Sequence, residues 1–410
     1  MHKLQNSVDT LPSKPRFASL DVIRGIAILG ILLMNIQSFS MIGQAYLNPM
    51  AYGDMTGLNK WVWIVSHVFA DQKFLSIFCI LFGASIVMIA EKTEAKTGRS
   101  LKVHYSRNLW LLIIGLAHGY LFWYGDILAP YAACSFALYF FRKLPAKALI
   151  GMGIIIFSIS SFIHIYEGMK VFKLPQSTLD QMSGGWTPNQ RIIDKNTAAY
   201  LGSFSDQLAQ RAKTLHMMQT VLFPTFYVWR ISGLMLIGMA LFKSGFLLGK
   251  STSHSYKRVF IRAASIGLAL VVCGLLFNFY HSWQLKYSMF FGAEFNYWGS
   301  LCIAMAYISG IILWIKSGKS ARLRERFASV GRMALSNYLL QTLICTSIFY
   351  GFGLGMFGQV SRTGQLGIVV ALWVLQLLIS PVWLRYFQFG PMEWLWRSLT
   401  KMKAQPLLKQ

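Results

Sequence analysis

Long apolar runs constrain this chain more than any other feature of its sequence. We expect about ten runs of roughly 17–25 residues, the length an α-helix needs to cross ~30 Å of hydrocarbon at 1.5 Å per residue. With 410 residues, of which 55% are hydrophobic and only 13% charged, the chain is too apolar for an ordinary soluble domain. The sequence therefore predicts an all-α integral membrane protein, with spans centred near Ile31, Leu81, Gly115, Phe136, Ile155, Met235, Val271, Ala306, Leu343 and Leu375.

The basic residues indicate how these spans are oriented. A formal net charge of +25 would suggest nucleic-acid binding in a soluble protein. Here the clearest clusters of Lys and Arg fall in alternate connections, at 92–107, 142–147, 250–262 and 316–326. Positive charge gathers on the cytoplasmic side of membrane proteins. We therefore expect both termini to be cytoplasmic, the lipid bilayer to be a partner, and nucleic acid not to be one.

The spans divide the chain into two halves around one long polar connection. We expect a cytoplasmic segment at 1–17, five helices in 18–165, an extracytoplasmic loop with an amphipathic helix at 166–217, five more helices in 218–400, and a cytoplasmic tail at 401–410. All five cysteines lie in apolar runs without C-x-x-C spacing. Neither a disulfide framework nor a metal site is therefore expected.

The third predicted span, within 107–133, contains an ionisable pair. His118 lies roughly 16 Å into the helix, near the midplane, and Asp126 follows at its outer end. Ionisable groups at membrane depth are costly and usually face a bundle interior, which makes both residues candidates for catalysis. The alternative is a neutral imidazole held by a carbonyl or hydroxyl group. Eight residues of straight helix separate the two side chains by about 80°, so direct contact requires a bend at Gly125.

Five further residues are candidates for substrate binding. Arg230 lies inside the sixth span and should face the interior, paired with an anion of the substrate or of the protein. Lys73 begins the second span, either as a snorkelling anchor or as a partner for phosphate or carboxylate. Asp21 and Arg24 share one face of the first helix, either as an interfacial ion pair or as part of a site. Asn35 lies further along that helix, in the outer half of the membrane.

Several stretches resemble one family of bacterial membrane proteins. They read R-F-A-S-L-D-V-I-R-G, D-Q-K-F-L-S-I-F-C-I-L-F-G, R-N-L-W-L-L-I-I-G-L-A-H-G-Y-L-F-W-Y-G-D-I-L, G-R-M-A-L-S-N-Y-L-L-Q-T and G-P-M-E-W-L-W-R-S-L-T. Together they extend from Phe17 to Thr400, and they resemble the YeiB-like proteins. This resemblance implies a multi-pass protein of the bacterial plasma (inner) membrane.

The resemblance also implies a relation of the N-terminal part to the multi-pass acyltransferases that include heparan-α-glucosaminide N-acetyltransferase. Those enzymes pass an acyl group from cytosolic acyl-CoA to an acceptor across the membrane. By this relation Asp21 and Arg24 match the first-helix motif, and Asn35 matches the asparagine later in that helix. The loop from Phe39 to Asn59 contains no histidine, so the resemblance supplies no counterpart of the catalytic histidine that those enzymes carry there.

Two hypotheses of function follow. In the first, the chain is a transmembrane acyltransferase with acyl-CoA as cosubstrate and no bound cofactor. His118, oriented by Asp126, acts as general base or acyl carrier towards a small-molecule, lipid or glycan acceptor, and Lys73 or Arg230 stabilises the oxyanion. In the second, it is a transporter or flippase whose midplane site contains Arg230 and His118. The sequence leaves open whether the protein forms a homo-oligomer.

Overall fold

The computed structural model describes residues 18–409, and the predicted segment 1–17 lies outside this range. Within it the chain is helical, as predicted, and no strand forms; one isolated bridge joins Phe387 to Leu408. Four short segments are 3-10 or π-helical: η1 (Tyr139–Lys143), η2 (Met218–Tyr227), η3 (Phe246–Leu248) and η4 (Ser288–Gly292). The α-helices are α1 (Ala18–Ser40), α2 (Gln44–Leu47), α3 (Gly57–Phe69), α4 (Lys73–Thr97), α5 (Ser100–Leu121), α6 (Leu128–Leu138), α7 (Ala146–Val171), α8 (Gln176–Trp186), α9 (Gln190–Leu201), α10 (Phe204–Met217), α11 (Val228–Lys243), α12 (Ser253–Tyr280), α13 (Leu285–Tyr287), α14 (Ala293–Lys316), α15 (Ala321–Arg332), α16 (Ala334–Phe349), α17 (Arg362–Tyr386) and α18 (Pro391–Lys401).

Seven helical segments in the described range are long and apolar enough to cross a membrane. The other predicted spans correspond to α5, α6 and α16. Of these, α6 has 11 residues and α16 has 16, fewer than the about 20 that a helix needs to span alone. The chain is thus an all-helical membrane protein, and the number of ten spans stays a prediction. The seven segments are Ala18–Ser40, Gly57–Thr97, Ala146–Val171, Phe204–Lys243, Ser253–Tyr280, Leu285–Lys316 and Arg362–Tyr386.

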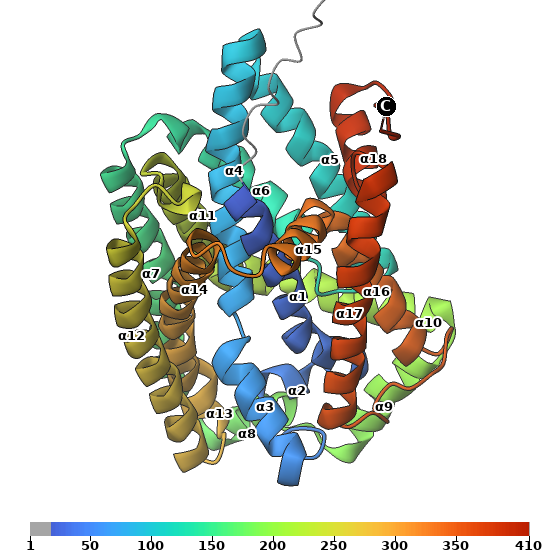
Figure 1. The fold of residues 1–410 in the computed structure, drawn as a ribbon. Helices are drawn as coiled ribbons and strands as arrows, with labels where there is room; N and C mark the ends of the chain where they lie inside the picture. The colour runs from blue at the N-terminus through green and yellow to red at the C-terminus, as the bar shows by residue number, and fades with distance from the viewer. Residues whose placement is uncertain (1–17, 410) are drawn as a thin grey trace, which may run out of the picture.

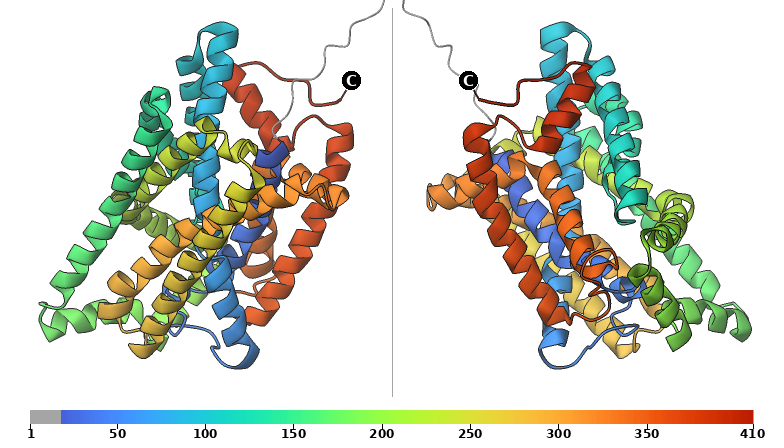
Figure 2. Two further views of the ribbon diagram at one scale, coloured as in Figure 1. Left: turned by 60° about the vertical axis from the view of Figure 1, so that its left-hand side comes forward. Right: turned by 90° about the vertical axis from the view of Figure 1, so that its right-hand side faces the viewer.

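The central helices are flanked by two groups (Figure 1). α1 and the α3–α4 pair run through the middle, α7, α11, α12 and α14 lie on one side, and α16, α17 and α18 lie on the other. The connection between α4 and α5 lies at the same end of the molecule as the C-terminus, whereas α3, α8 and α13 lie at the opposite end. Figure 2 shows this separation from two other sides. The basic connection at 92–107 is therefore far from the predicted external loop at 166–217.

Glycine contacts bring α4 and α11 to backbone distance. A Cβ atom added at Gly83 would lie 1.9 Å from the carbonyl oxygen of Met235, and one added at Gly238 would lie 2.0 Å from that of Ile80. Small residues allow such approach between membrane helices, where van der Waals packing drives association. This packing fixes the position of α11 relative to α4, and with it the side chains that the two helices direct towards each other.

The backbone is irregular where three helices of this core begin. Gln72, between α3 and α4, adopts a left-handed conformation with φ 63°, which costs a non-glycine residue roughly 1–2 kcal/mol. The π-helix η2 runs directly into α11, and the π-helix η4 runs directly into α14. π-helical turns are rare and occur frequently at functional sites. The starts of α4, α11 and α14 are therefore the part of the fold to search for a site.

Candidate functional site

A buried row of three hydrogen-bonded side chains links α5, α6 and α16. The Nδ1 atom of His118 lies 2.8 Å from Oδ1 of Asp126, and its Nε2 atom lies 3.0 Å from Oγ1 of Thr342. The other oxygen of Asp126 accepts the backbone N–H of Ala129 in the first turn of α6 at 2.8 Å. His118 and Asp126 are only 3% and 7% exposed. His118 and Asp126 are therefore in direct contact, which the sequence analysis expected only if the helix bends between them.

The bend that permits this contact comes earlier than the sequence suggested. α5 ends at Leu121, and the backbone N–H groups of Phe122 and Trp123 both bond to the carbonyl oxygen of His118. The chain then turns back, so Asp126 returns beside the last turn of α5. Gly115 permits this return, since a Cβ atom there would lie 2.8 Å from Oδ2 of Asp126. The contact therefore forms because α5 ends at Leu121, and not through the bend at Gly125 that the sequence suggested it would require.

The two hydrogen bonds of His118, to Asp126 and to Thr342, can be assigned a donor and an acceptor. An ionised carboxylate only accepts hydrogen bonds, so Asp126 assigns the proton to Nδ1 of His118. The Nε2 atom is then the acceptor for the hydroxyl of Thr342. A hydroxyl, a base and a group that orients the base are the parts that nucleophilic catalysis requires. Because the row is closed to solvent, a substrate reaches Nε2 only when the packing around it opens.

A second buried cluster surrounds Asp71 at the break between α3 and α4. Its Oδ1 atom accepts the hydroxyl of Tyr46 at 3.1 Å, and its Oδ2 atom accepts the amide of Asn296 at 2.8 Å. The Nδ1 atom of His67 lies 3.1 Å from the same Oδ2 atom. Burial and the neighbouring Asp71 carboxylate raise the pKa of Tyr46 well above its usual value. Tyr46 therefore remains a hydrogen-bond donor to Asp71 at physiological pH.

Lys73 is part of this second cluster. Its Nζ atom donates to the carbonyl oxygen of His67 at 2.7 Å and to Oδ1 of Asn296 at 2.5 Å. The side chain is 0% exposed, so the snorkelling role was wrong for this lysine. Both of its hydrogen-bond acceptors are neutral, and Asp71 lies within electrostatic range. The cluster thus contains a lysine and a carboxylate that share Asn296 as a bridge.

Arg230 enters the same cluster from the first turn of α11. Its Nη2 atom donates to Oγ of Ser76 at 2.9 Å, to Oγ of Ser300 at 2.8 Å, and at 3.5 Å to the carbonyl oxygen of Gln72. The ring of Tyr297 lies 4.7 Å from the guanidinium carbon, within cation–π range. Arg230 is 0% exposed, which confirms that it faces the interior.

The first-helix candidates include one local ion pair. Asp21 and Arg24 form an ion pair at 3.1 Å, and Asn35 is half-buried roughly 16 Å from Arg24 by the helical rise. The ion pair that the sequence left as one of two alternatives is formed, and a substrate role for these residues stays a prediction.

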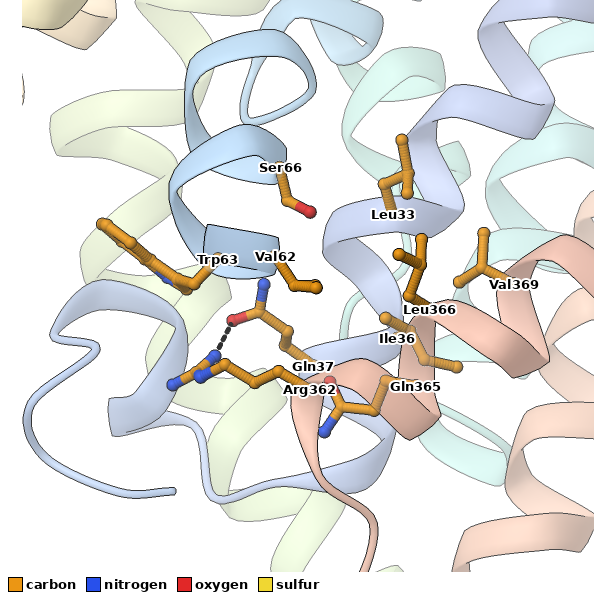
Figure 3. A pocket seen from close by; sticks show the side chains of 10 residues that line it. All are labelled: Leu33, Ile36, Gln37, Val62, Trp63, Ser66, Arg362, Gln365, Leu366 and Val369. Carbon is orange, nitrogen blue, oxygen red and sulfur yellow. Dashed lines mark hydrogen bonds between the residues drawn. The ribbon is translucent and has the colours of Figure 1, made fainter. Parts of the chain in front are cut away.

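A small cavity lies beside α3, between α1 and α17 (Figure 3). It has a volume of about 10 Å³, room for about one water molecule. Arg362 borders it, and its Nη1 atom donates to Oε1 of Gln37 at 2.8 Å. Trp63, on the wall formed by α3, stacks on His67 with ring centroids 4.9 Å apart. The cavity is therefore separated from the Asp71 cluster by one layer of aromatic rings.

Several residues of the two clusters were not selected from the sequence, among them His67, Asp71, Asn296 and Thr342. The first two had a signal, because His67 and Asp71 are four residues apart and share a helix face. Nothing local marks Asn296 or Thr342, which reach their partners only through tertiary packing. Among the described residues, no group of three or more His, Cys, Asp or Glu side chains is placed to hold a metal ion.

The fold and these clusters define a class: an all-helical integral membrane protein with buried, hydrogen-bonded ionisable groups in its core. Residues 241–403 match the family model described as protein of unknown function (DUF418). The uncharacterized protein YeiB of Escherichia coli (strain K12) is 33% identical over 397 residues, covering 96% of this chain and 99% of YeiB. The chain therefore belongs to the YeiB-like family.

Two further relatives also align with this chain over almost the whole length of both proteins. The uncharacterized protein YxaH of Bacillus subtilis (strain 168) is 29% identical over 430 residues, with 99% of each chain covered. An uncharacterized 39.9 kDa protein from the amylase 3′ region of Bacillus acidopullulyticus is 25% identical over 405 residues, with 98% of each covered. The similarity to all three spans both halves of the chain, so the N-terminal helices and the DUF418 region occur together in these relatives.

Proposed function

We propose that this protein transfers an acyl group from cytosolic acyl-CoA to an acceptor on the other side of the membrane. The observation that supports this proposal is the row from Asp126 through His118 to Thr342, a carboxylate, a base and a hydroxyl at 2.8 and 3.0 Å. Asp126 orients the ring through Nδ1, and Nε2 faces a hydroxyl group, which is the arrangement that general-base catalysis requires.

The chemistry assigned to the row is a single transfer. When the packing opens, an acceptor hydroxyl or amine takes the place of the Thr342 hydroxyl at Nε2 of His118 and gives up its proton there. The acceptor atom attacks the thioester carbon, the carbon–sulfur bond breaks, and the coenzyme A thiolate receives the proton from the imidazolium. Asp126 holds the ring and stabilises its positive charge. Asp21, Arg24, Asn35, Lys73 and Arg230 remain the predicted substrate-binding residues.

The orientation belongs to the same proposal. Both termini face the cytoplasm of a bacterial cell, ten spans cross its plasma membrane, and the acceptor is met on the side of α8, α9 and α10. Acyl-CoA then approaches the basic end of the molecule, where the α4–α5 connection lies together with the C-terminus (Figure 1). A polyanionic cosubstrate is favoured at that end by the sign of its charge.

A matched pair of histidine variants tests the catalytic role. His118→Gln removes the base, and His104→Gln changes another buried histidine of α5, whose Nε2 atom lies 3.0 Å from the carbonyl oxygen of Ser135. Purified protein is incubated with labelled acyl-CoA, and release of coenzyme A and acyl transfer are followed. We expect a loss of about 10²–10⁴-fold in His118→Gln and little change in His104→Gln. Acyl-CoA left intact by the wild type, or equal rates in both variants, would contradict the proposal.

A specific observation favours transport as a second candidate. Three helices have irregular starts around Lys73 and Arg230, and interrupted helices near a buried charge are the usual form of a transporter site. Uptake of a solute into proteoliposomes that is lost in Arg230→Ala, in a protein that leaves acyl-CoA intact, would replace acyl transfer by transport. Uptake unaffected by Arg230→Ala would remove this candidate.

A further inference from the structure

Arg230 is the most incompletely satisfied charged group in the described part of the fold. A guanidinium has five N–H donors, and the three contacts to Ser76, Ser300 and Gln72 all involve Nη2. The Nε and Nη1 atoms are buried and have no hydrogen-bond partner among the described residues. Three donors of a fully buried cation therefore have no acceptor, a condition that native structures avoid because an unsatisfied buried donor lowers stability.

Arg230 has no anionic partner among the described residues. Asp71 and Lys73 lie nearby and are bridged by the side-chain amide of Asn296. No carboxylate within residues 18–409 lies at ion-pair distance from Arg230. Buried charge is normally paired, so one negative charge is missing from this site.

The aromatic rings restrict where that charge can lie. Tyr297, Phe157 and Phe226 lie 4.7, 5.6 and 6.0 Å from the guanidinium carbon. Rings at these distances are within cation–π range of the guanidinium but supply no negative charge. An anion that pairs with Arg230 would accept the N–H groups in the plane of the guanidinium. The carbonyl oxygen of Gln72, whose backbone is left-handed, accepts a hydrogen bond from Arg230, and the π-helix η2 runs directly into the first turn of α11, which contains Arg230.

We propose that this cluster is a binding site for one carboxylate group, whose oxygen atoms accept the free N–H donors on Nε and Nη1 of Arg230. A monoanion balances the charge of Arg230, whereas a doubly charged phosphate would bring a second negative charge into a buried site. Two oxygen atoms with two lone pairs each match three in-plane donors. The site does not depend on acyl transfer at His118, so the failure of either proposal leaves the other intact.

Ligand-dependent thermal stability tests the site with sodium acetate as the probe. A ligand that binds only the folded state raises the unfolding temperature in a saturable way. We expect the wild type in detergent to be stabilised by acetate at about 100 mM, and Arg230→Met not to respond. Arg211→Met is the matched control. Arg211 is also fully buried, but only its Nη2 atom lacks a partner, because Nε donates to the carbonyl oxygen of Tyr120 and Nη1 donates to Oε1 of Gln207. This control should respond like the wild type.

Further arms of the experiment identify the anion and guard against a variant that does not fold. Sodium phosphate and sodium chloride are compared at equal ionic strength. Arg230→Lys keeps the buried charge but loses the planar donors, and we expect its response to acetate to be at least tenfold weaker than that of the wild type. Equal stabilisation by chloride or by phosphate would overturn the assignment to a carboxylate. An unchanged response in either Arg230 variant, or none in the wild type, would overturn the site.

Discussion

Replacing Arg230 by methionine should make the ligand-free protein more stable, although the side chain lies in the middle of the core. The change removes three hydrogen bonds from Nη2, but it leaves no new unsatisfied donor. Oγ of Ser76 still donates to the carbonyl oxygen of Gln72 at 2.8 Å, and Oγ of Ser300 still donates to that of Tyr297 at 2.8 Å. It also removes three N–H groups without acceptors and one uncompensated charge.

The magnitude follows from what is known of buried charges. Replacing such a group by an apolar side chain of similar volume is often neutral or stabilising by about 1–4 kcal/mol. At no more than about 2 °C per kcal/mol for a chain longer than 250 residues, the unfolding temperature should rise by up to about 8 °C. Unfolding in detergent without added anion, followed by tryptophan fluorescence, measures this shift.

A variant that is expected to lose stability, where Arg230→Met is expected to gain it, provides the control. Asp71→Leu leaves Lys73 and Arg230 buried together without a carboxylate, which should cost about 3–5 kcal/mol. Because the residues share one cluster, the double variant with Arg230→Met should recover part of this loss, and the two effects should not add. If Arg230→Met unfolds several degrees below the wild type in the absence of anion, the guanidinium contributes to the fold, and the reasoning from its missing acceptors is refuted.

Three other predictions test packing, charge and topology. Gly83→Ala should destabilise the protein by about 1–3 kcal/mol, since its Cβ atom meets a backbone oxygen of α11 at 1.9 Å, whereas Gly151→Ala, with open space around it, should not. Burial raises the pKa of the Glu393 carboxyl, so the wild type should lose stability relative to Glu393→Gln as the pH rises from about 4 to 8, and the opposite trend would contradict this. In intact cells and a cysteine-free background, an impermeant maleimide should label Ser183→Cys and not Lys319→Cys; the reverse pattern would invert the proposed orientation.

The sequence predicted the features that depend on the local pattern of apolar and charged residues. Apolar run length gave the helices of the core, and the depth of Arg230 in a span gave its burial, because a guanidinium cannot face lipid at low cost. The contact between His118 and Asp126 was harder to predict. It depends on α5 ending at Leu121, where the sequence L-F-W-Y-G-D contains no proline and its one glycine comes only four residues later.

Other parts of the site could not be read from the chain. Lys73 has the position of a snorkelling anchor, and only the packing of α14 against α4 brings Asn296 to it. Gln72 adopts a left-handed conformation that non-glycine residues rarely take. The backbone preferences of the local sequence therefore do not predict the break between α3 and α4. The contact of Lys73 with Asn296 joins helices more than 200 residues apart in sequence.

The two buried clusters differ in what they need. In the row from Asp126 to Thr342, both nitrogen atoms of His118 have partners, so the folded chain is complete there without a ligand. Around Arg230 the backbone is strained at Gln72 and three donors lack acceptors. Features that lower stability persist where function requires them. The two clusters are therefore best separated by one measurement, the acyl-transfer rate of Arg230→Met. A large loss would place the acyl donor or acceptor at Arg230 and join both clusters into one site, whereas an unchanged rate would assign Arg230 to a separate anion.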